Sequence, residues 1–266
     1  MQTQLAVLIR DNKVALRNWR VWVHMGVSDL SNRFAKSALG PLWIVLNLAM
    51  WVVGVGLVYA KLFNMEMREF LPFLTIGFGV WGFLVATLTE GGQAFVMAEG
   101  YIKQFTYPKQ IYMLRFLVNY SLVLCVSLVA FFVVAILYQR RIDFGTLWVL
   151  LGLVVLILIS YAHITVMAYL TARFRDLPHG VGSLMQVLFF LTPVMFTAEK
   201  LAEKGLDFIY KYNPLYYLIE IVRYPLMEAK AAPIEVYVAS GIYLILISIV
   251  ALVTARVLDK RLVYIL

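Results

Sequence analysis

The chain has 266 residues, of which 63% are apolar and only 14% are charged. Ordinary soluble domains carry roughly 25% charged residues, so this composition excludes a water-soluble globule, a disordered chain and a disulfide scaffold. The net charge of +8 would suggest nucleic acid in a soluble protein, whereas basic loops on the cytoplasmic side account for it in a membrane protein. The sequence therefore predicts an all-α polytopic membrane protein with no nucleic-acid partner.

The N-terminal segment, residues 1–37, is predicted to form cytoplasmic interface helices. It carries charges where a signal peptide has an apolar core, so we expect it to be retained. On a helix, residues 5–23 place apolar and basic side chains on different faces, which indicates an amphipathic helix lying along the membrane surface. Its basic face would contact anionic lipid headgroups or a protein, and an ordinary soluble helix is the alternative. The apolar face contains Leu5, Leu8, Ile9, Leu16, Trp19, Trp22 and Val23, and the basic face contains Arg10, Lys13, Arg17 and Arg20.

Six apolar runs follow, each of which is predicted to cross the membrane as a helix. Most Lys and Arg residues fall in the segments that would share a side with the N-terminus. By the positive-inside rule, both termini are expected in the cytoplasm. The predicted spans are residues 38–62, 70–96, 114–138, 146–172 and 180–197 within residues 38–197, and residues 233–257, followed by a cytoplasmic tail at 258–266.

Residues 198–232 are too polar to span a membrane and too apolar for a solvated loop. They are predicted to form two short re-entrant helices, which requires protein or a water-filled cavity around their ends. The second helix begins behind Asn213 and Pro214, because Asn is a good N-cap and Pro suits the first helical turn. It carries Tyr216 and Tyr217 near its start.

The sequence contains no phosphate-binding loop, nucleophile elbow or paired-histidine zinc motif. We therefore expect no enzymatic activity, cofactor or metal site in this chain, and any ATP hydrolysis to come from another subunit. His163, in the fourth run, is interpreted as an interhelical hydrogen-bond partner rather than a proton carrier.

Glu90 is the clearest candidate for an intramembrane charge, near the inner end of the second run. Because an uncompensated charge at bilayer depth is costly, such a residue is a functional candidate. Three roles stay open: packing or cavity lining together with Gln93, gating, and proton coupling.

Two predicted inner loops carry unusual residues. Residues 99–109 combine bulky and basic side chains, and an exposed Ile102, Phe105 and Tyr107 would form a docking surface for another protein. Anchoring of these aromatics at the membrane interface is the alternative. Residues 173–178 are charged and end in proline, which also fits an ordinary positive-inside turn.

Aromatic residues make up 15% of the chain, and most are expected in interfacial belts or helix packing. Five lie inside apolar runs, where belts are not expected: Trp51, Tyr59, Tyr120, Phe189 and Phe190. Because aromatic rings stack on the C–H faces of sugars, a conduit lined by them would let a hydrated polymer slide.

Three segments in order resemble one family: Arg33-Phe-Ala-Lys-Ser-Ala-Leu-Gly-Pro-Leu-Trp43 before the first span, Phe174-Arg175-Asp176-Leu177 before the fifth, and Asn213-Pro214-Leu215 after it. With the basic N-terminal helix, they resemble the membrane subunit of ABC-2 type polysaccharide exporters over nearly the whole chain, as one domain spanning 1–266. The resemblance implies a homodimer paired with two nucleotide-binding ATPase subunits, which bind ATP and Mg²⁺. It also implies a bacterial inner-membrane location and a lipid-linked polysaccharide substrate, with O-antigen first and capsule or teichoic acid exporters as relatives.

The same resemblance assigns roles to the singled-out residues. Residues 99–109 would form a coupling helix seated in the ATPase, with the N-terminal helix and residues 173–178 at the same interface. The first and fifth spans would line the conduit, and residues 198–232 would form an outer gate. The implied coupling residues are Tyr101, Ile102, Lys103, Phe105, Tyr107, Pro108, Arg173, Arg175 and Asp176. The implied sugar contacts are Trp51, Tyr59, Phe189 and Phe190, to which the aromatic pattern adds Tyr120 of the third span. The implied gate residues are Asn213, Pro214, Tyr216 and Tyr217.

Alternatives from the same and other classes stay open. An ABC-2 permease for a drug or another lipid would share the fold. An ion-coupled transporter would work without ATP and depend on Glu90. An intramembrane enzyme would need convergent acid, base or metal groups, whereas Glu90 and His163 lie at unrelated positions in the sequence.

Overall fold

Helices form all the regular structure in the described part of the computed structural model, which covers residues 4–62, 65–105, 107–140 and 142–266. This confirms the all-α prediction. The side chain of Leu5, predicted on the apolar face, and residue 106 of the predicted coupling segment lie outside the described residues.

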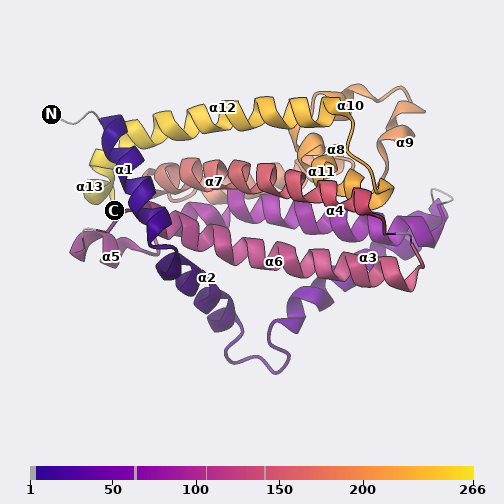
Figure 1. Cartoon of the computed structure of the whole chain (residues 1–266), viewed down its shortest axis with the longest axis horizontal. Coiled ribbons are helices and arrows are strands. Elements are labelled where there is room, and N and C mark those ends of the chain that lie inside the picture. The colour runs from indigo at the N-terminus through magenta and orange to yellow at the C-terminus, as the bar shows by residue number, and fades with distance from the viewer. Residues whose placement is uncertain (1–3, 63–64, 106, 141) are drawn as a thin grey trace.

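The long helices run side by side, and both chain ends lie at one end of the bundle (Figure 1). We call this the terminal end, and the opposite end, which carries α9 and α10, the far end. The helices are α1 (Gln4–Arg17), α2 (Trp19–Arg33), α3 (Leu42–Leu62), α4 (Met67–Leu88), η1 (Glu90–Ala94), α5 (Glu99–Gln104), α6 (Gln110–Leu137), η2 (Phe144–Trp148), α7 (Val149–Arg173), α8 (Leu177–Leu191), α9 (Ala198–Ala202), α10 (Phe208–Lys211), α11 (Pro214–Glu228), α12 (Ile234–Leu258), η3 (Asp259–Arg261) and α13 (Leu262–Ile265).

Five helical segments in the described residues are long and apolar enough to cross a membrane, so six spans are not confirmed. The predicted fifth span, 180–197, overlaps α8 (Leu177–Leu191), whose 15 residues fall short of the roughly 20 that a span needs. Thr192 follows α8 with extended dihedral angles. Because Thr192 precedes Pro193, and proline disfavours a helical conformation in the residue before it, the helix ends at Leu191.

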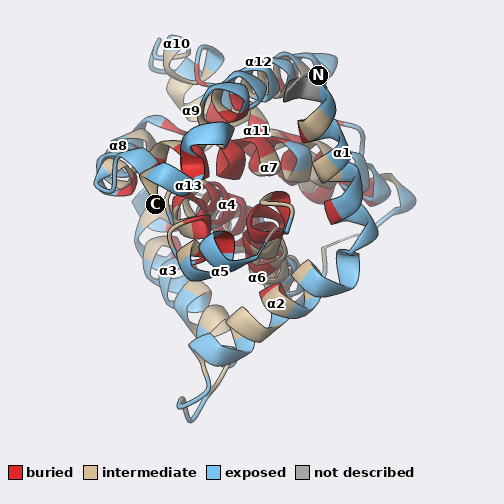
Figure 2. Cartoon of the chain, turned by 90° about the vertical axis from the view of Figure 1, so that its left-hand side faces the viewer, coloured by how far each residue is buried: buried red, intermediate tan, exposed pale blue. Residues whose placement is uncertain are grey.

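The core lies around α4 and α7. In their most apolar stretches 61% and 56% of residues are buried, against 11% in α3 and 17% in the segment containing α12. Figure 2, which looks onto the terminal end, shows the same arrangement, with buried residues in the centre and exposed ones on α3 and α8. Helix α11 packs among α4, α7 and α12. Gly152 of α7 permits this, because a Cβ atom there would lie 2.1 Å from the carbonyl oxygen of Ile221.

The single amphipathic helix predicted for residues 5–23 is divided between α1 and α2. Asn18 separates α1 from α2 with non-helical dihedral angles. This break divides the predicted apolar face. Leu8 is buried and Trp22 packs partly against the core, whereas Leu16 and Trp19 are exposed.

Both N-terminal helices are fastened to the bundle. Asp29 of α2 forms an ion pair with Arg115 of α6. The Tyr161 hydroxyl of α7 donates a hydrogen bond to Asn12 Oδ1 of α1, at 2.8 Å. The segment is therefore part of the folded body and not a detached surface helix.

Candidate transport site

The two predicted inner loops meet at the terminal end. Lys103 Nζ donates a hydrogen bond to Glu99 Oε1 at 2.7 Å, and Arg175 Nη2 lies 3.7 Å from Glu99 Oε2. The hydrogen bond from Lys103, its charge and the charge of Arg175 lower the pKa of Glu99 below its ordinary value. Glu99 therefore links α5 to the loop between α7 and α8 as an anion.

Helix α5 and the residues that follow it carry a row of exposed aromatic side chains, which we call the docking row. Tyr101, Phe105 and Tyr107 are 54%, 52% and 61% exposed. Consecutive ring centroids lie 6.4 and 6.3 Å apart. The prediction that Ile102 is exposed is wrong: it is buried, because the short helix turns this side chain toward the core and so anchors α5.

The loop between α7 and α8 is exposed beside the docking row. The Arg173 guanidinium lies 5.5 Å from the ring centroid of Phe174. The Asp176 carbonyl oxygen accepts the His179 N–H at 3.0 Å, and α8 starts there. Arg173, Arg175 and Asp176 are all exposed, as are Lys103 and the docking row, while Pro108 is half-buried.

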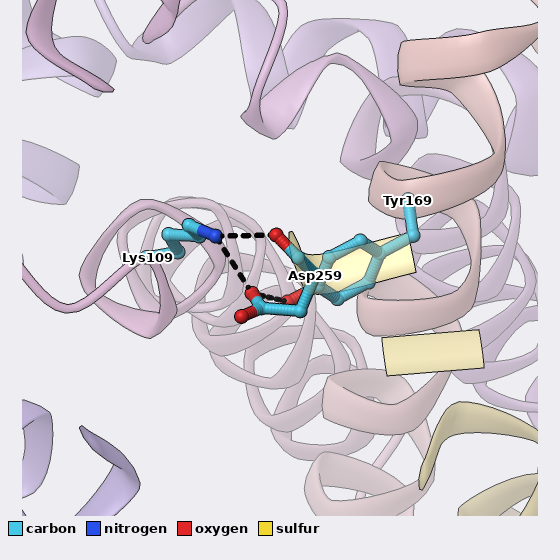
Figure 3. A network of polar contacts seen from close by, with 3 residues as sticks. All are labelled: Lys109, Tyr169 and Asp259. Atoms are coloured by element: carbon cyan, nitrogen blue, oxygen red, sulfur yellow. Dashed lines mark hydrogen bonds and ion pairs between the residues drawn. The ribbon is translucent and has the colours of Figure 1, made fainter. Parts of the chain in front are cut away.

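A polar network lies at the end of the docking segment, the name that we give to residues 99–105 and 107–109 (Figure 3). Lys109 Nζ donates to Asp259 Oδ1 at 2.9 Å and to the Asp259 carbonyl oxygen at 2.7 Å. The Tyr169 hydroxyl donates to the same Oδ1 at 2.7 Å. Neither Tyr169 nor Asp259 was identified from the sequence, because 150 residues separate Lys109 from Asp259 and no local pattern connects them.

Three of the five predicted sugar contacts come together in an aromatic cluster of α3, α4 and α8, which we call the aromatic track. Trp51 and Phe189 lie on either side of Phe78, with centroids 6.0 and 5.8 Å from it. Trp81 and Phe190 lie 5.6 and 5.5 Å from Phe189. Phe78 and Trp81 were not identified from the sequence as candidate sugar contacts. Their spacing of three residues indicates that they share a helix face, but it does not indicate which neighbouring helix that face contacts.

The other two predicted sugar contacts have different surroundings. Tyr120 is buried, its hydroxyl donates to Glu90 Oε2 at 2.7 Å, and its ring lies 6.1 Å from that of Phe116. Tyr59 is half-buried against an apolar cluster that includes Phe70 and Phe73, and Phe78 and Phe189 of the aromatic track pack against the same cluster. Tyr59 therefore lies against apolar residues that also contact the track.

Glu90 and His163, two polar residues of the predicted spans, have defined partners. Glu90 lies in η1, beyond the end of α4, and is exposed; in the described part of the chain its hydrogen-bond partner is Tyr120, while Gln93 is half-buried in the same turn. His163 Nε2 and the Tyr243 hydroxyl share a hydrogen bond of 2.7 Å between α7 and α12. This confirms the interhelical role predicted for His163.

The start of α11 confirms the predicted cap. Asn213 Oδ1 accepts the Leu215 N–H at 3.0 Å, and Asn213 Nδ2 donates to Thr192 Oγ1 at 2.8 Å. Pro214 occupies the first turn. The cap therefore also fixes α11 to the segment that follows α8.

Tyr216 and Tyr217 follow in the first turn of α11. Their ring centroids lie 5.2 Å apart, and Tyr216 is 5.1 Å from Tyr210 of α10. The Tyr217 hydroxyl donates to the Lys211 carbonyl oxygen at 2.9 Å. These tyrosines join α10 to α11.

A buried charge pair in α11 was also missed from the sequence. Arg223 is 1% exposed, forms an ion pair with Glu220, and lies 3.9 Å from the ring centroid of Phe73 in α4. Residues 198–232 were predicted to form re-entrant helices, and neither charge was given a role there. Their spacing of three residues on one helix was the available signal.

No cluster of three or more potential metal ligands occurs among the described residues. Five apolar, span-length helices around a buried core define a multi-pass membrane protein. Residues 21–227 match the ABC-2 type transporter family, and the chain belongs to that family of transmembrane transport subunits.

The chain is also similar to curated transport proteins. The chain is similar to two proteins described as "O-antigen export system permease protein RfbA" from Klebsiella pneumoniae, with 23% and 24% identity; each alignment covers 70% of this chain and 72% of the relative. A protein of the same description from Myxococcus xanthus is 27% identical over 66% of this chain and 68% of its own length. The chain is an ABC-2 permease with the likeness of polysaccharide exporters.

Proposed function

We propose that the chain is the channel-forming permease subunit of an ATP-driven exporter of lipid-linked polysaccharide, with O-antigen as the leading substrate. Two copies of the chain associate with two separate ATPase subunits, which bind ATP and Mg²⁺. The observation that carries the proposal is the similarity to three proteins described as O-antigen export permeases, over about two thirds of each chain or more.

The docking row supports the ATPase partner. Exposed aromatic side chains at the centre of an interface contribute much of its binding energy. Tyr101, Phe105 and Tyr107 are each more than half exposed, while Ile102 holds the helix in place and the Glu99 ion pairs connect it to the neighbouring loop. A partner that binds here contacts one rigid surface made of both inner loops.

The aromatic track supports a polysaccharide substrate. Trp51 and Phe190 are 57% and 67% exposed, so their rings are accessible along the face that α3 and α8 contribute. A row of ring faces contacts sugars through many weak and similar interactions, so a polymer moves along it without a strong fixed site.

Charge and hydropathy support the proposed location. Most Lys and Arg residues lie in the segments that share a side of the membrane with the N-terminus, which by the positive-inside rule supports a cytoplasmic location of both termini. The chain then resides in the bacterial inner membrane, with α9 to α11 forming an outer gate at the far end. Helix α11 is re-entrant in this arrangement, and its polar ends are shielded by protein.

In the proposed mechanism, ATP binding draws the two ATPase subunits together and moves α5. ATP and polymer each favour a different state of the permease, because a ligand shifts an equilibrium only through its differential affinity for the two states. Alternation between the states opens and narrows the conduit.

The test is purification of the tagged chain in mild detergent, followed by reconstitution with the ATPase that accompanies it. We expect a stoichiometric ATPase and ATP-dependent transport of lipid-linked O-antigen into the vesicles. Transport of a drug or a simple lipid in place of the polysaccharide would refute the substrate assignment. Transport that requires a proton gradient and Glu90, with no ATPase present, would refute the ABC mechanism.

A further inference from the structure

We propose that Asp259 is a positioning residue for transport: it fastens the docking segment to α12, so that movement of α5 drives α12 and, through α12, the gate helix α11. The inference rests on the proposed function, because it explains how ATPase movement at the terminal end reaches the far end.

The fastening is direct. Lys109 is the last residue of the docking segment and immediately precedes α6. Its ammonium group donates to both the carboxylate and the carbonyl oxygen of Asp259, the residue that follows α12. The two side chains are 21% and 23% exposed, so water and salt screen this pair less than a fully exposed one.

Tyr169 gives the contact a fixed reference point. Its hydroxyl donates to Asp259 Oδ1, and the residue is 1% exposed in the central helix α7. Its ring lies edge-on to Phe95 with centroids 4.8 Å apart, and Phe95 is fully buried four residues before α5 begins. Asp259 therefore accepts hydrogen bonds from both the docking segment and the central helix (Figure 3).

Helix α12 continues from this point to the proposed gate. Its 25 residues form one helix about 37 Å long at 1.5 Å per residue. At the other end, the Ser240 hydroxyl donates to the Tyr217 carbonyl oxygen of α11 at 3.4 Å. The Ala232 N–H donates to the Tyr237 hydroxyl at 3.3 Å, which fixes the connection between α11 and α12. A displacement at Asp259 therefore reaches α11 through packed, hydrogen-bonded elements.

The experiment compares coupling among variants in proteoliposomes that contain the permease and its co-purifying ATPase. Lys109→Ala and Asp259→Ala break the contact, and Tyr169→Phe removes only its hydroxyl donor. Lys260→Ala is the matched control, because it removes an exposed charge next to Asp259. For each protein we measure bound ATPase, ATP hydrolysis and export of lipid-linked O-antigen.

We expect Lys109→Ala and Asp259→Ala to bind the ATPase and hydrolyse ATP like wild type, but to export about tenfold less polymer per ATP. This corresponds to a loss of about 1.4 kcal/mol in coupling free energy. Tyr169→Phe should lower the amount of polymer exported per ATP by less than the alanine variants do. Lys260→Ala should leave this ratio unchanged. A purely structural role would lower the amount of folded protein without changing export per ATP.

Three results would overturn the inference: unchanged export per ATP in both alanine variants, loss of ATPase binding in parallel with export, or an equal effect of Lys260→Ala. If the alanine variants fail to fold, the double variant Lys109→Asp with Asp259→Lys tests the contact instead. Export per ATP restored to the wild-type level supports the contact, and export per ATP that is not restored refutes it. A wild-type protein that binds no ATPase refutes the proposed function itself. This result distinguishes failure of the proposed function from failure of the inference about Asp259.

Discussion

Arg223→Met tests whether the buried charge pair holds α11 against α4. The Arg223 and Glu220 side chains are 1% and 12% exposed. Removing one member of a buried pair costs about 3–5 kcal/mol, because the other charge is left uncompensated. The loss includes the contact of the guanidinium with Phe73, since a desolvated cation–π pair contributes about 2 kcal/mol. We expect the variant to lose about 4 kcal/mol of unfolding free energy.

The double variant Glu220→Gln with Arg223→Met removes both charges at similar volume. Because replacing a whole buried pair is often neutral, we expect most of the lost stability to return. The assay is denaturation in mixed detergent micelles, followed by tryptophan fluorescence. Lys230→Met, an exposed charge just beyond α11, is the control. A loss below about 1 kcal/mol for Arg223→Met, the scale of a surface pair, would refute the reasoning, as would a double variant no more stable than the single one.

Three further outcomes are expected. Phe105→Ala with Tyr107→Ala should weaken binding of the ATPase about thirtyfold while the permease stays inserted, because each exposed ring contributes about 1 kcal/mol or more at an interface centre; unchanged export would remove the docking role. Gly152→Ala should cost about 1–3 kcal/mol in the micelle assay, because its Cβ would lie 2.1 Å from the Ile221 carbonyl oxygen and force α11 away from α7; wild-type stability would contradict this close approach. Trp51→Ala should lower polymer export about threefold to tenfold at unchanged ATP hydrolysis, as expected for a stacking contact of about 1 kcal/mol. Trp51→Phe should retain most of the wild-type export. Export of Trp51→Ala equal to that of Trp51→Phe would exclude Trp51 from the conduit.

Local chemistry made part of the structure predictable. Asn213 and Pro214 mark the start of α11 because a side-chain cap and a fixed φ angle act within a few residues. The apolar runs predicted the long helices, because hydropathy is also a property of neighbouring residues. A hydrogen bond from His163 to another helix was predictable as well, because a buried imidazole needs a partner. The end of α8 at Leu191 was also encoded locally, by the proline two residues later.

Features that depend on tertiary contacts could not be predicted in this way. The burial of Ile102 depends on how a six-residue helix rotates against the bundle. The pairing of Lys109 with Asp259 joins segments 150 residues apart. Phe78 and Trp81 became candidates only when α4 was placed beside α3 and α8. Sequence periodicity identifies a helix face, but not the neighbour that covers it.

The distribution of burial indicates which helices can move during transport. Helices α4 and α7 are buried over most of their apolar stretches, whereas only a small share of the residues in α3 and in the segment containing α12 is buried within this chain. Elements with less buried apolar area shift at lower free-energy cost than the central pair. The Lys109–Asp259 contact joins the docking segment to peripheral α12, and the aromatic track includes Trp51 of peripheral α3. We therefore expect the transport movement in α3 and α12 around a stationary α4–α7 core, with Tyr169 as the fixed end of the coupling network.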